Sequence, residues 1–348
     1  MGTRDTRRSN RARRRCGAAI ATAAIAASSA CAPPPAPGQS YRVPADFGEA
    51  AVTAARDLFG PPPGANLADC TPTAAHPRPV VLAHGILGNM ADNMGGLAPE
   101  LANQGYCVYA LTYGAAPGSI FGGIADIRRS SIDEFGPFVD GVLAATGARQ
   151  VDVIGHSEGS VMPRWWMRYG DSVHPDGTPK VANMIGVAPV SNGDDLGGLA
   201  TQMRSIPLFA GVLDELAKNG CGACEQLVAG SSFFHQLNTT APQPGERFSG
   251  PAQPGVRYLM LASVWENFVV PYRSGFIDHP AVTNMTLQDA CPIDEADHLA
   301  IAFDPVAYDL VSAFLDPTHP IPQRCVATQP VFWRVDQRSG LRAHPARR

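Results

Sequence analysis

The segment Gly155-His156-Ser157-Glu158-Gly159 carries the strongest chemical signal in the chain, a serine with a glycine two positions before and after it. The β-branched run Val151–Ile154 leads straight into it, so a buried strand is predicted to end there. A serine on a sharp, strained strand-to-helix turn leaves room only for glycine-sized neighbours. The helix that follows, from Ser160 onward, directs its N-terminal dipole at this point and favours a developing oxyanion. We therefore predict a nucleophile at Ser157, although a chain with 35 glycines can also place these five residues in an ordinary turn.

Two backbone N–H groups near this serine are expected to bind the oxyanion. The predicted strand Pro79–Ala83 is followed by His84-Gly85-Ile86-Leu87-Gly88-Asn89, and a loop in this position supplies one donor. The residue after the nucleophile supplies the other. We assign the N–H groups of Ile86 and Glu158, whose side chains can vary because only backbone geometry is needed. The alternative for His84-Gly85 is a plain turn that closes a strand.

A general base must take the proton from the serine, and the chain order of nucleophile, acid and base places it far downstream. His298 is our candidate, because its polar loop Asp297-His298-Leu299 turns into an apolar segment. His279 and His319 each precede proline, which restricts them to extended geometry. His344 lies in an arginine-bearing tail. A histidine in a generic loop is the alternative interpretation of His298.

The base needs an acid that holds its imidazole in one tautomer, and this acid is expected at the end of the preceding strand. The predicted strand Val256–Ala262 is followed directly by Val264-Trp265-Glu266, which makes Glu266 the first candidate. The rivals are Asp278, Asp294 and Asp297. Of these, Asp297 is too close in sequence to reach behind the neighbouring histidine. The alternative for Glu266 is a solvated loop carboxylate.

Strands alternate with helices from residue 79 onward, and this order predicts an α/β fold with a mostly parallel sheet covered on both faces. The predicted strands are Pro79–Ala83, Cys107–Leu111, Val151–Ile154, Val181–Val187 and Val256–Ala262. The predicted helices are Phe47–Leu58, Leu97–Gln104, Ile124–Ala145 and Pro305–Leu315. One domain is expected over residues 76–325. An apolar insert at about residues 192–250 falls where a lid would cover the site, and it can equally be a surface loop pinned by disulfides.

The N-terminus predicts export. Seven arginines within residues 1–15 precede a short run of small apolar residues, so residues 1–30 are expected to be a secretory signal. Residues 31–75 are a Pro-, Ala- and Gly-rich segment, and residues 326–348 a C-terminal tail. Lipid attachment through Cys31 is the alternative to free secretion, and an internal basic arm is the alternative to a signal. The modest net charge of −4 argues against a nucleic-acid partner.

Cys16 and Cys31 lie in or at the edge of the predicted signal, and the remaining six cysteines are expected to form three disulfides in an oxidising compartment. Of the fifteen possible connectivities, candidate pairs are Cys70 with Cys107, Cys221 with Cys224, and Cys291 with Cys325, but the sequence leaves the pairing open. The C-x-x-C pair lacks a second pair with zinc spacing. No metal or other cofactor is predicted.

The blocks His84-Gly85, Gly155–Gly159, Val270-Pro271-Tyr272 and Asp297-His298-Leu299 closely resemble secreted bacterial lipases and esterases of the α/β-hydrolase superfamily, often called class 2 lipases. The resemblance covers most of residues 79–315. It implies an α/β-hydrolase fold with Ser157 as nucleophile, the position of Glu266 as acid and His298 as base. Two residues depart from the family pattern. The acid is commonly aspartate, and Glu158 replaces a neutral residue, adding a charge that disfavours an oxyanion if it turns inward.

These features predict an exported serine carboxylic-ester hydrolase that acts on acylglycerols or related fatty acyl esters through an acyl-enzyme. We expect a lipid or small ester substrate and transient contact with lipid interfaces, without an obligate protein partner. Met162, Trp165 and Trp166 are predicted mainly to pack against the sheet, although they would also suit an acyl chain. The alternatives are an acyltransferase that uses the same residues and a non-catalytic cell-envelope protein that has kept the fold.

Overall fold

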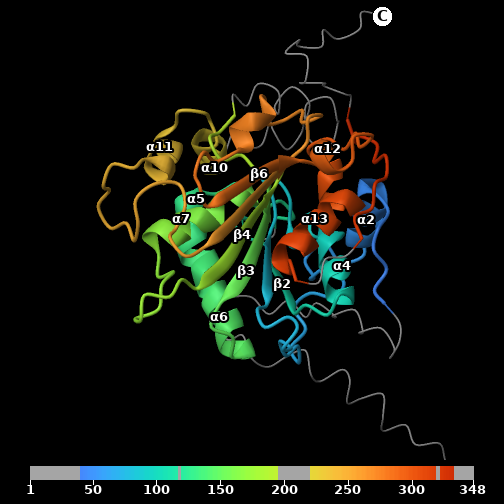
Figure 1. Ribbon diagram of the computed structural model, residues 1–348, viewed down its shortest axis with the longest axis horizontal. Helices are drawn as coiled ribbons and strands as arrows, with labels where there is room; N and C mark the ends of the chain where they lie inside the picture. The colour runs from blue at the N-terminus through green and yellow to red at the C-terminus, as the bar shows by residue number, and fades with distance from the viewer. Residues whose placement is uncertain (1–39, 117–118, 195–219, 319–321, 333–348) are drawn as a thin grey trace, which may run out of the picture.

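A six-stranded, fully parallel sheet forms the centre of the protein in a computed structural model that describes residues 40–116, 119–194, 220–318 and 322–332 (Figure 1). The strand order is β2-β1-β3-β4-β5-β6. The strands are β1 (Val80–Ala83), β2 (Val108–Leu111), β3 (Val151–His156), β4 (Val181–Val187), β5 (Arg257–Ala262) and β6 (Val282–Thr286). The predicted α/β fold with a parallel sheet is therefore confirmed.

The first five strands follow the predicted ones closely, whereas β6 was not predicted. Its sequence, Val-Thr-Asn-Met-Thr, has no continuous apolar run, and Thr283 and Asn284 are exposed. β6 pairs only with β5 and forms one edge of the sheet. An edge strand that is half exposed does not need the apolar side chains by which buried strands are identified.

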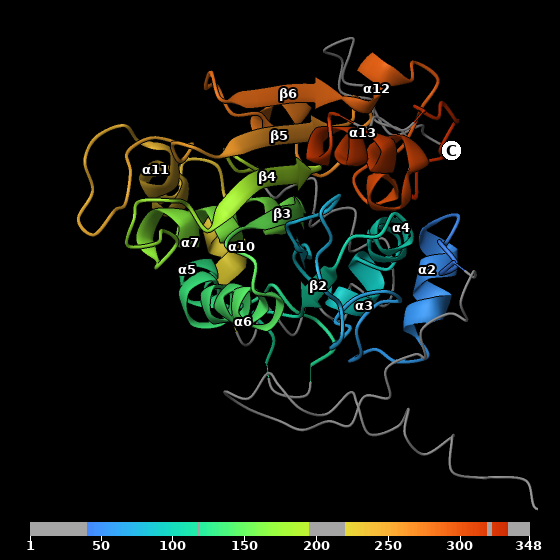
Figure 2. The ribbon, with the colours of Figure 1, turned by 60° about the horizontal axis from the view of Figure 1, so that its bottom comes forward.

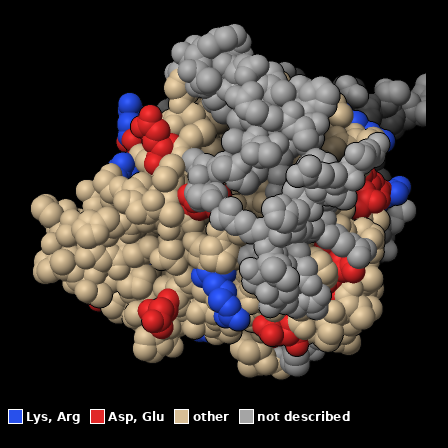
Figure 3. Space-filling view, turned by 90° about the horizontal axis from the view of Figure 1, so that it is seen from above, with Lys and Arg blue, Asp and Glu red and all other residues tan. Residues whose placement is uncertain are grey.

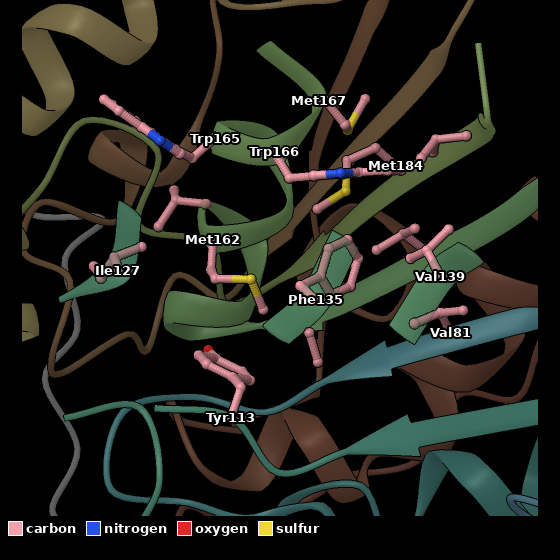
Figure 4. Close-up of a cluster of buried hydrophobic side chains, with 14 of the residues drawn as sticks. Val81, Tyr113, Ile127, Phe135, Val139, Met162, Trp165, Trp166, Met167 and Met184 are labelled. Carbon is pink, nitrogen blue, oxygen red and sulfur yellow. The ribbon is translucent and has the colours of Figure 1, made fainter. Parts of the chain in front are cut away.

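Side chains that alternate along each strand build two hydrophobic layers, one on each face of the sheet. On one face, Val81 and Met184 pack with Phe135, Val139 and Met162 (Figure 4). The helical segments of this layer are α5 (Ile127–Arg129), the π-helical turn η1 (Ser130–Phe135), α6 (Gly136–Thr146) and α7 (Met162–Tyr169). Met162, Trp165 and Trp166 are buried in this cluster, so their predicted packing role is confirmed.

The opposite face carries a second layer. Leu82, Ile154 and Leu259 point to this side and pack against helices α4 (Leu97–Asn103) and α13 (Pro305–Leu315). In Figure 2, α4 and α13 lie on the opposite side of the sheet from α6 and α7, and α2 and α3 lie next to α4. The remaining helical elements are α2 (Phe47–Ala54), α3 (Met90–Asn93), α10 (Gly222–Gln226), α11 (Ser232–Asn238), α12 (Leu287–Ala290), and the 3-10 turns η2 (Ser157–Ser160), η3 (Tyr272–Gly275) and η4 (Ala300–Phe303). Helices on both faces are thus confirmed.

Two predicted helices differ in their bounds. The long helix predicted from Ile124 begins at Ile127 as α5. It changes to the π-helical turn η1 and then returns to α-helix in α6. α2 ends at Ala54 rather than Leu58, because the chain then tightens into 3-10 hydrogen bonds from Arg56 and Asp57 to carbonyls three residues back. A run of three prolines that begins at residue 61 follows, and it cannot continue a helix.

The described part of the insert packs on the core. Phe233 and Phe234 in α11 are buried in the same hydrophobic layer as α7, and α10 contacts α5. Residues 195–219 of the predicted insert lie outside the described residues, so its role as a lid stays a prediction.

Three disulfides form with the candidate pairing, Cys70–Cys107, Cys221–Cys224 and Cys291–Cys325. The first fastens the segment before β1 to β2, and the third fastens the C-terminal segment to the end of α12. The predicted signal with Cys16 lies outside the described residues, as do Cys31 and residues 333–348.

The described surface in Figure 3 carries acidic and basic side chains in small separate groups on a largely uncharged background. Over the described ranges, no helix is long and apolar enough to cross a membrane. Within the same ranges, no group of three or more His, Cys, Asp or Glu residues is placed to hold a metal ion.

Candidate active site

The candidate residues come from four separate segments that meet at the carboxyl edge of the sheet. Ser157 follows β3, Ile86 follows β1, Glu266 follows β5 and His298 follows β6 and α12. In open parallel sheets, ligands bind outside the carboxyl ends of the strands, so this is the edge where a site is expected.

Ser157 occupies the strained turn that its flanking glycines predict. Its φ is +53°, a left-handed conformation that costs energy for a residue with a side chain. A Cβ on Gly155 would lie 1.7 Å from the carbonyl oxygen of Gly159, and a Cβ on Gly159 would lie 2.2 Å from that of Ala83. Both glycines are therefore required by the backbone, which lets the turn hold the hydroxyl at the end of β3.

His298 lies between Ser157 and Glu266 in a continuous hydrogen-bonded chain. Its Nε2 lies 2.9 Å from Ser157 Oγ, and its Nδ1 lies 2.9 Å from Glu266 Oε2. All three residues are buried, with exposed fractions of 7%, 1% and 3% for Ser157, Glu266 and His298. With Nδ1 donating to the carboxylate, Nε2 is free to accept the serine proton.

The hydrogen bonds of the second carboxylate oxygen of Glu266 explain how a glutamate fits at the candidate acid position, where aspartate is common in the family. Glu266 Oε1 accepts the backbone N–H groups of Asn267, Phe268 and Val269 at 2.9, 2.8 and 3.2 Å. The carboxylate thus folds back over its own turn, which takes up the extra methylene and fixes Oε2 toward His298.

The three rival carboxylates lie elsewhere. Asp278 is exposed. Asp297 accepts from Ala300 N, Asn267 Nδ2 and Phe332 N, so it holds loops together. Asp294 interacts with Asp304, whose pKa burial and this neighbouring carboxyl raise to about 9, so the pair holds a proton at neutral pH.

The loop after β1 holds Ile86 beside the serine. Gly85 N–H donates to Asn93 Oδ1 at 2.7 Å, and Leu87 N–H donates to the Gly122 carbonyl at 2.9 Å. Within the described part of the chain, the N–H of Ile86 between them donates to no protein acceptor. Glu158 is the second residue of η2, where an N–H has no partner inside the helix. Both predicted donors are thus available.

Glu158 turns its carboxyl into the protein rather than toward solvent. Its exposed fraction is 1%, and burial raises its pKa well above the ordinary value of 4.5, with the hydroxyl of Tyr113 as its polar neighbour. Burial therefore favours the neutral form of this carboxyl and opposes a negative charge beside the oxyanion.

The raised pKa of Glu158 makes the stability of the folded protein depend on pH. In the unfolded chain Glu158 loses its proton above about pH 4.5, whereas the raised pKa lets the folded protein keep the proton to a higher pH, so stability falls as pH rises from that value towards the raised pKa. Glu158→Gln removes this cost of up to about 1.4 kcal/mol per pH unit. We expect the difference in thermal unfolding temperature, Glu158→Gln minus wild type, to increase from pH 4 to pH 8. A difference in unfolding temperature that stays constant across this range would show that the pKa of Glu158 is not raised in the folded protein.

Two histidines and an asparagine support the site, and sequence reasoning did not find these roles. His156 Nε2 donates to the carbonyl of His298 at 2.8 Å, and its Nδ1 lies 3.1 Å from Asn93 Oδ1. Burial lowers the pKa of His156 to about 3 and that of His84 to about 4, so both are neutral. His84 accepts from Tyr113 N. Only the folded contacts reveal these roles, because nothing in their spacing marks them.

A cavity of about 280 Å³ opens beside Ser157 and His298, and its walls are mostly apolar. The apolar wall residues include Ile86, Leu87, Phe121, Val190, Leu227, Phe268, Leu299 and Phe332. Phe332, which falls in the predicted C-terminal tail, contacts Phe268 in a tilted arrangement with ring centroids 5.3 Å apart. The site can therefore hold an apolar group next to a serine hydroxyl.

The fold and this constellation define an α/β-hydrolase. The model of the family described as Lipase (class 2) matches residues 77–251, about half of the chain, and the protein belongs to that family. The match includes Ser157 and Ile86 and ends before Glu266 and His298.

A solved lipase structure shares the fold, and two other solved structures are similar at lower TM-scores. Lipase B from Aspergillus fumigatus is 17% identical, with a TM-score of 0.51 over 71% of this chain and 54% of that one, so the present chain spans about half the length of that lipase. A gene product from Listeria innocua is 13% identical, with a TM-score of 0.42 over 73% of this chain and 97% of that one. A pyrethroid hydrolase from Sphingobium faniae is 17% identical, with a TM-score of 0.40 over 69% and 98%.

Proposed function

We propose that the protein is an exported serine carboxylic-ester hydrolase, a lipase or carboxylesterase that works through an acyl-enzyme. The observation that carries the proposal is the hydrogen-bonded chain from Ser157 through His298 to Glu266, with 2.9 Å at each step. Membership of the class 2 lipase family supports an ester substrate in general.

In the proposed reaction, Ser157 Oγ attacks the ester carbonyl while His298 Nε2 takes the hydroxyl proton. The carbonyl oxygen becomes an oxyanion, which accepts hydrogen bonds from the N–H groups of Ile86 and Glu158. His298 then gives its proton to the leaving alcohol. Water, deprotonated by the same imidazole, attacks the acyl-enzyme and releases the acid. Glu266 Oε2 accepts the hydrogen bond from His298 Nδ1 and stabilises the imidazolium.

The cavity supports an acyl ester as substrate, because its apolar walls suit a hydrocarbon chain and the serine lies at its side. We infer no organic cofactor, metal or obligate protein partner for this chemistry, and only transient contact with lipid interfaces. Within the chain, we propose residues 1–30 as the export signal and residues 76–325 as the hydrolase domain. N-terminal sequencing of the secreted protein tests the signal, with a start near residue 31 expected and an intact residue 1 contradicting it.

Release of p-nitrophenol from a series of p-nitrophenyl esters tests the activity. We expect free carboxylic acid as the main product in water, and none with Ser157→Ala beyond the background rate. A new ester as main product after addition of an alcohol would instead favour an acyltransferase. A folded protein without any turnover would favour a non-catalytic envelope protein.

A further inference from the structure

Helix α2 and the turn that follows it present small and apolar side chains to the cavity, which we call the stripe. The stripe consists of Phe47, Ala51, Ala54 and Leu58, four cavity-lining residues from the segment that precedes the matched family domain. Phe47, Ala51 and Ala54, spaced four and three residues apart, lie on one face of α2. Leu58 lies in the turn after the helix. The sequence predicted a helix over Phe47–Leu58 within a Pro-, Ala- and Gly-rich segment, and in the fold this helix forms a wall of the cavity.

The position of α2 is fixed by its own contacts. Ala50, with 1% exposed, packs with Phe47, Ala302 and Phe303, and the rings of Phe47 and Phe303 meet edge to face with centroids 5.8 Å apart. Asp46 caps the helix by accepting the N–H of Glu49 at 2.9 Å. Because η4 with Phe303 begins two residues after His298, the wall is attached to the loop that carries the candidate base.

Two of the four positions in the stripe are alanines. A leucine or phenylalanine there would extend into the space that Ser157 and His298 share, whereas alanine leaves that space open. The cavity volume of about 280 Å³ is at the small end of the usual range for ligand sites, so one larger side chain removes a considerable part of it.

We propose that α2 closes the acyl-chain site and that Ala51 and Ala54 set the length of acyl chain it accepts. This inference rests on the proposed ester hydrolysis and names the part of the substrate that the cavity holds. The acyl chain lies along the stripe while its carbonyl carbon is bonded to Ser157 Oγ. Each buried methylene contributes about fourfold to the specificity constant.

Ala54→Phe tests the proposal with p-nitrophenyl esters from acetate to palmitate. We expect kcat/KM for acetate within about twofold of the wild type, because a two-carbon acyl group does not reach α2. For long acyl chains we expect a loss of about 15- to 60-fold, equivalent to two or three methylenes. The matched control is Val52→Phe, which adds a ring on the solvent side of the same helix, where Val52 is 64% exposed. This control is expected to keep the wild-type profile.

Leu58→Ala provides a second variant that enlarges the cavity, and it is expected to shift the preferred acyl length upward. An unchanged acyl profile in both variants would overturn the proposal. So would a profile that follows alcohol length in a series of acetate esters, since the wall would then contact the leaving group. Failure of ester hydrolysis itself has a different signature, because the wild type would then turn over no ester of any length.

Discussion

Ser157→Ala is expected to lower kcat for ester hydrolysis by about 10⁵- to 10⁶-fold while the protein remains folded. His298 Nε2 contacts the Ser157 hydroxyl at 2.9 Å, and removal of this hydroxyl leaves the oxyanion donors without a nucleophile. Alanine fits the turn with less side chain than serine, so the change should not disturb the backbone. The measurement is the initial rate with a p-nitrophenyl ester, beside thermal unfolding of both proteins.

A matched control is Ser249→Ala, which removes the same hydroxyl from an exposed position. Its rate should equal that of the wild type. A Ser157→Ala variant that is folded and retains more than a small fraction of the wild-type rate would contradict a serine acyl-enzyme at this turn.

Glu266→Gln is expected to lower kcat by about 10⁴-fold with little change in KM. Glutamine keeps the size of the side chain but removes the charge that stabilises the imidazolium and fixes the Nδ1–H tautomer of His298. Glu266→Asp is the informative companion. It keeps the charge but is one methylene shorter, so it cannot accept the three backbone N–H groups and reach His298 in the same conformation. We expect its rate to lie between those of wild type and Glu266→Gln.

Near-wild-type activity of Glu266→Gln would contradict the assignment of the acid. The test is strict because the structure places the rival carboxylates in other roles, with Asp294 paired with Asp304 and Asp297 holding two loops. Steady-state rates over a range of substrate concentrations separate kcat from KM and decide the outcome.

The buried strands and the strand-to-helix turn were predictable from sequence, because their chemistry is local. The β-branched run before Gly155 favours a strand at that place. The glycines around Ser157 are needed because a Cβ at either position would collide with the backbone of the turn. His298 could be proposed as the base from the chain order of nucleophile, acid and base, and because two other downstream histidines precede proline. Glu266 was predicted only as the first of several carboxylates, since the fold of its side chain over Asn267–Val269 leaves no mark in the sequence.

The walls of the cavity could not be predicted, because they come from opposite ends of the chain. α2 lies in a segment rich in Pro, Ala and Gly, and Phe332 lies in the predicted tail. Their meeting at the site depends on long-range contacts such as Phe47 with Phe303 and Phe332 with Asp297. The raised pKa of Glu158 could not be predicted either, since it results from burial that only the fold creates.

Labelling with a fluorophosphonate, followed by peptide mass spectrometry, tests the central claim most directly. Such a probe phosphonylates a serine whose hydroxyl is activated by a neighbouring base, without any assumption about the natural ester. We predict one adduct per chain on the peptide that contains Ser157, none in Ser157→Ala, and strongly slowed labelling in His298→Ala. Folded wild-type protein that takes up no probe, or takes it up at another serine, would contradict a serine hydrolase built on Ser157, His298 and Glu266.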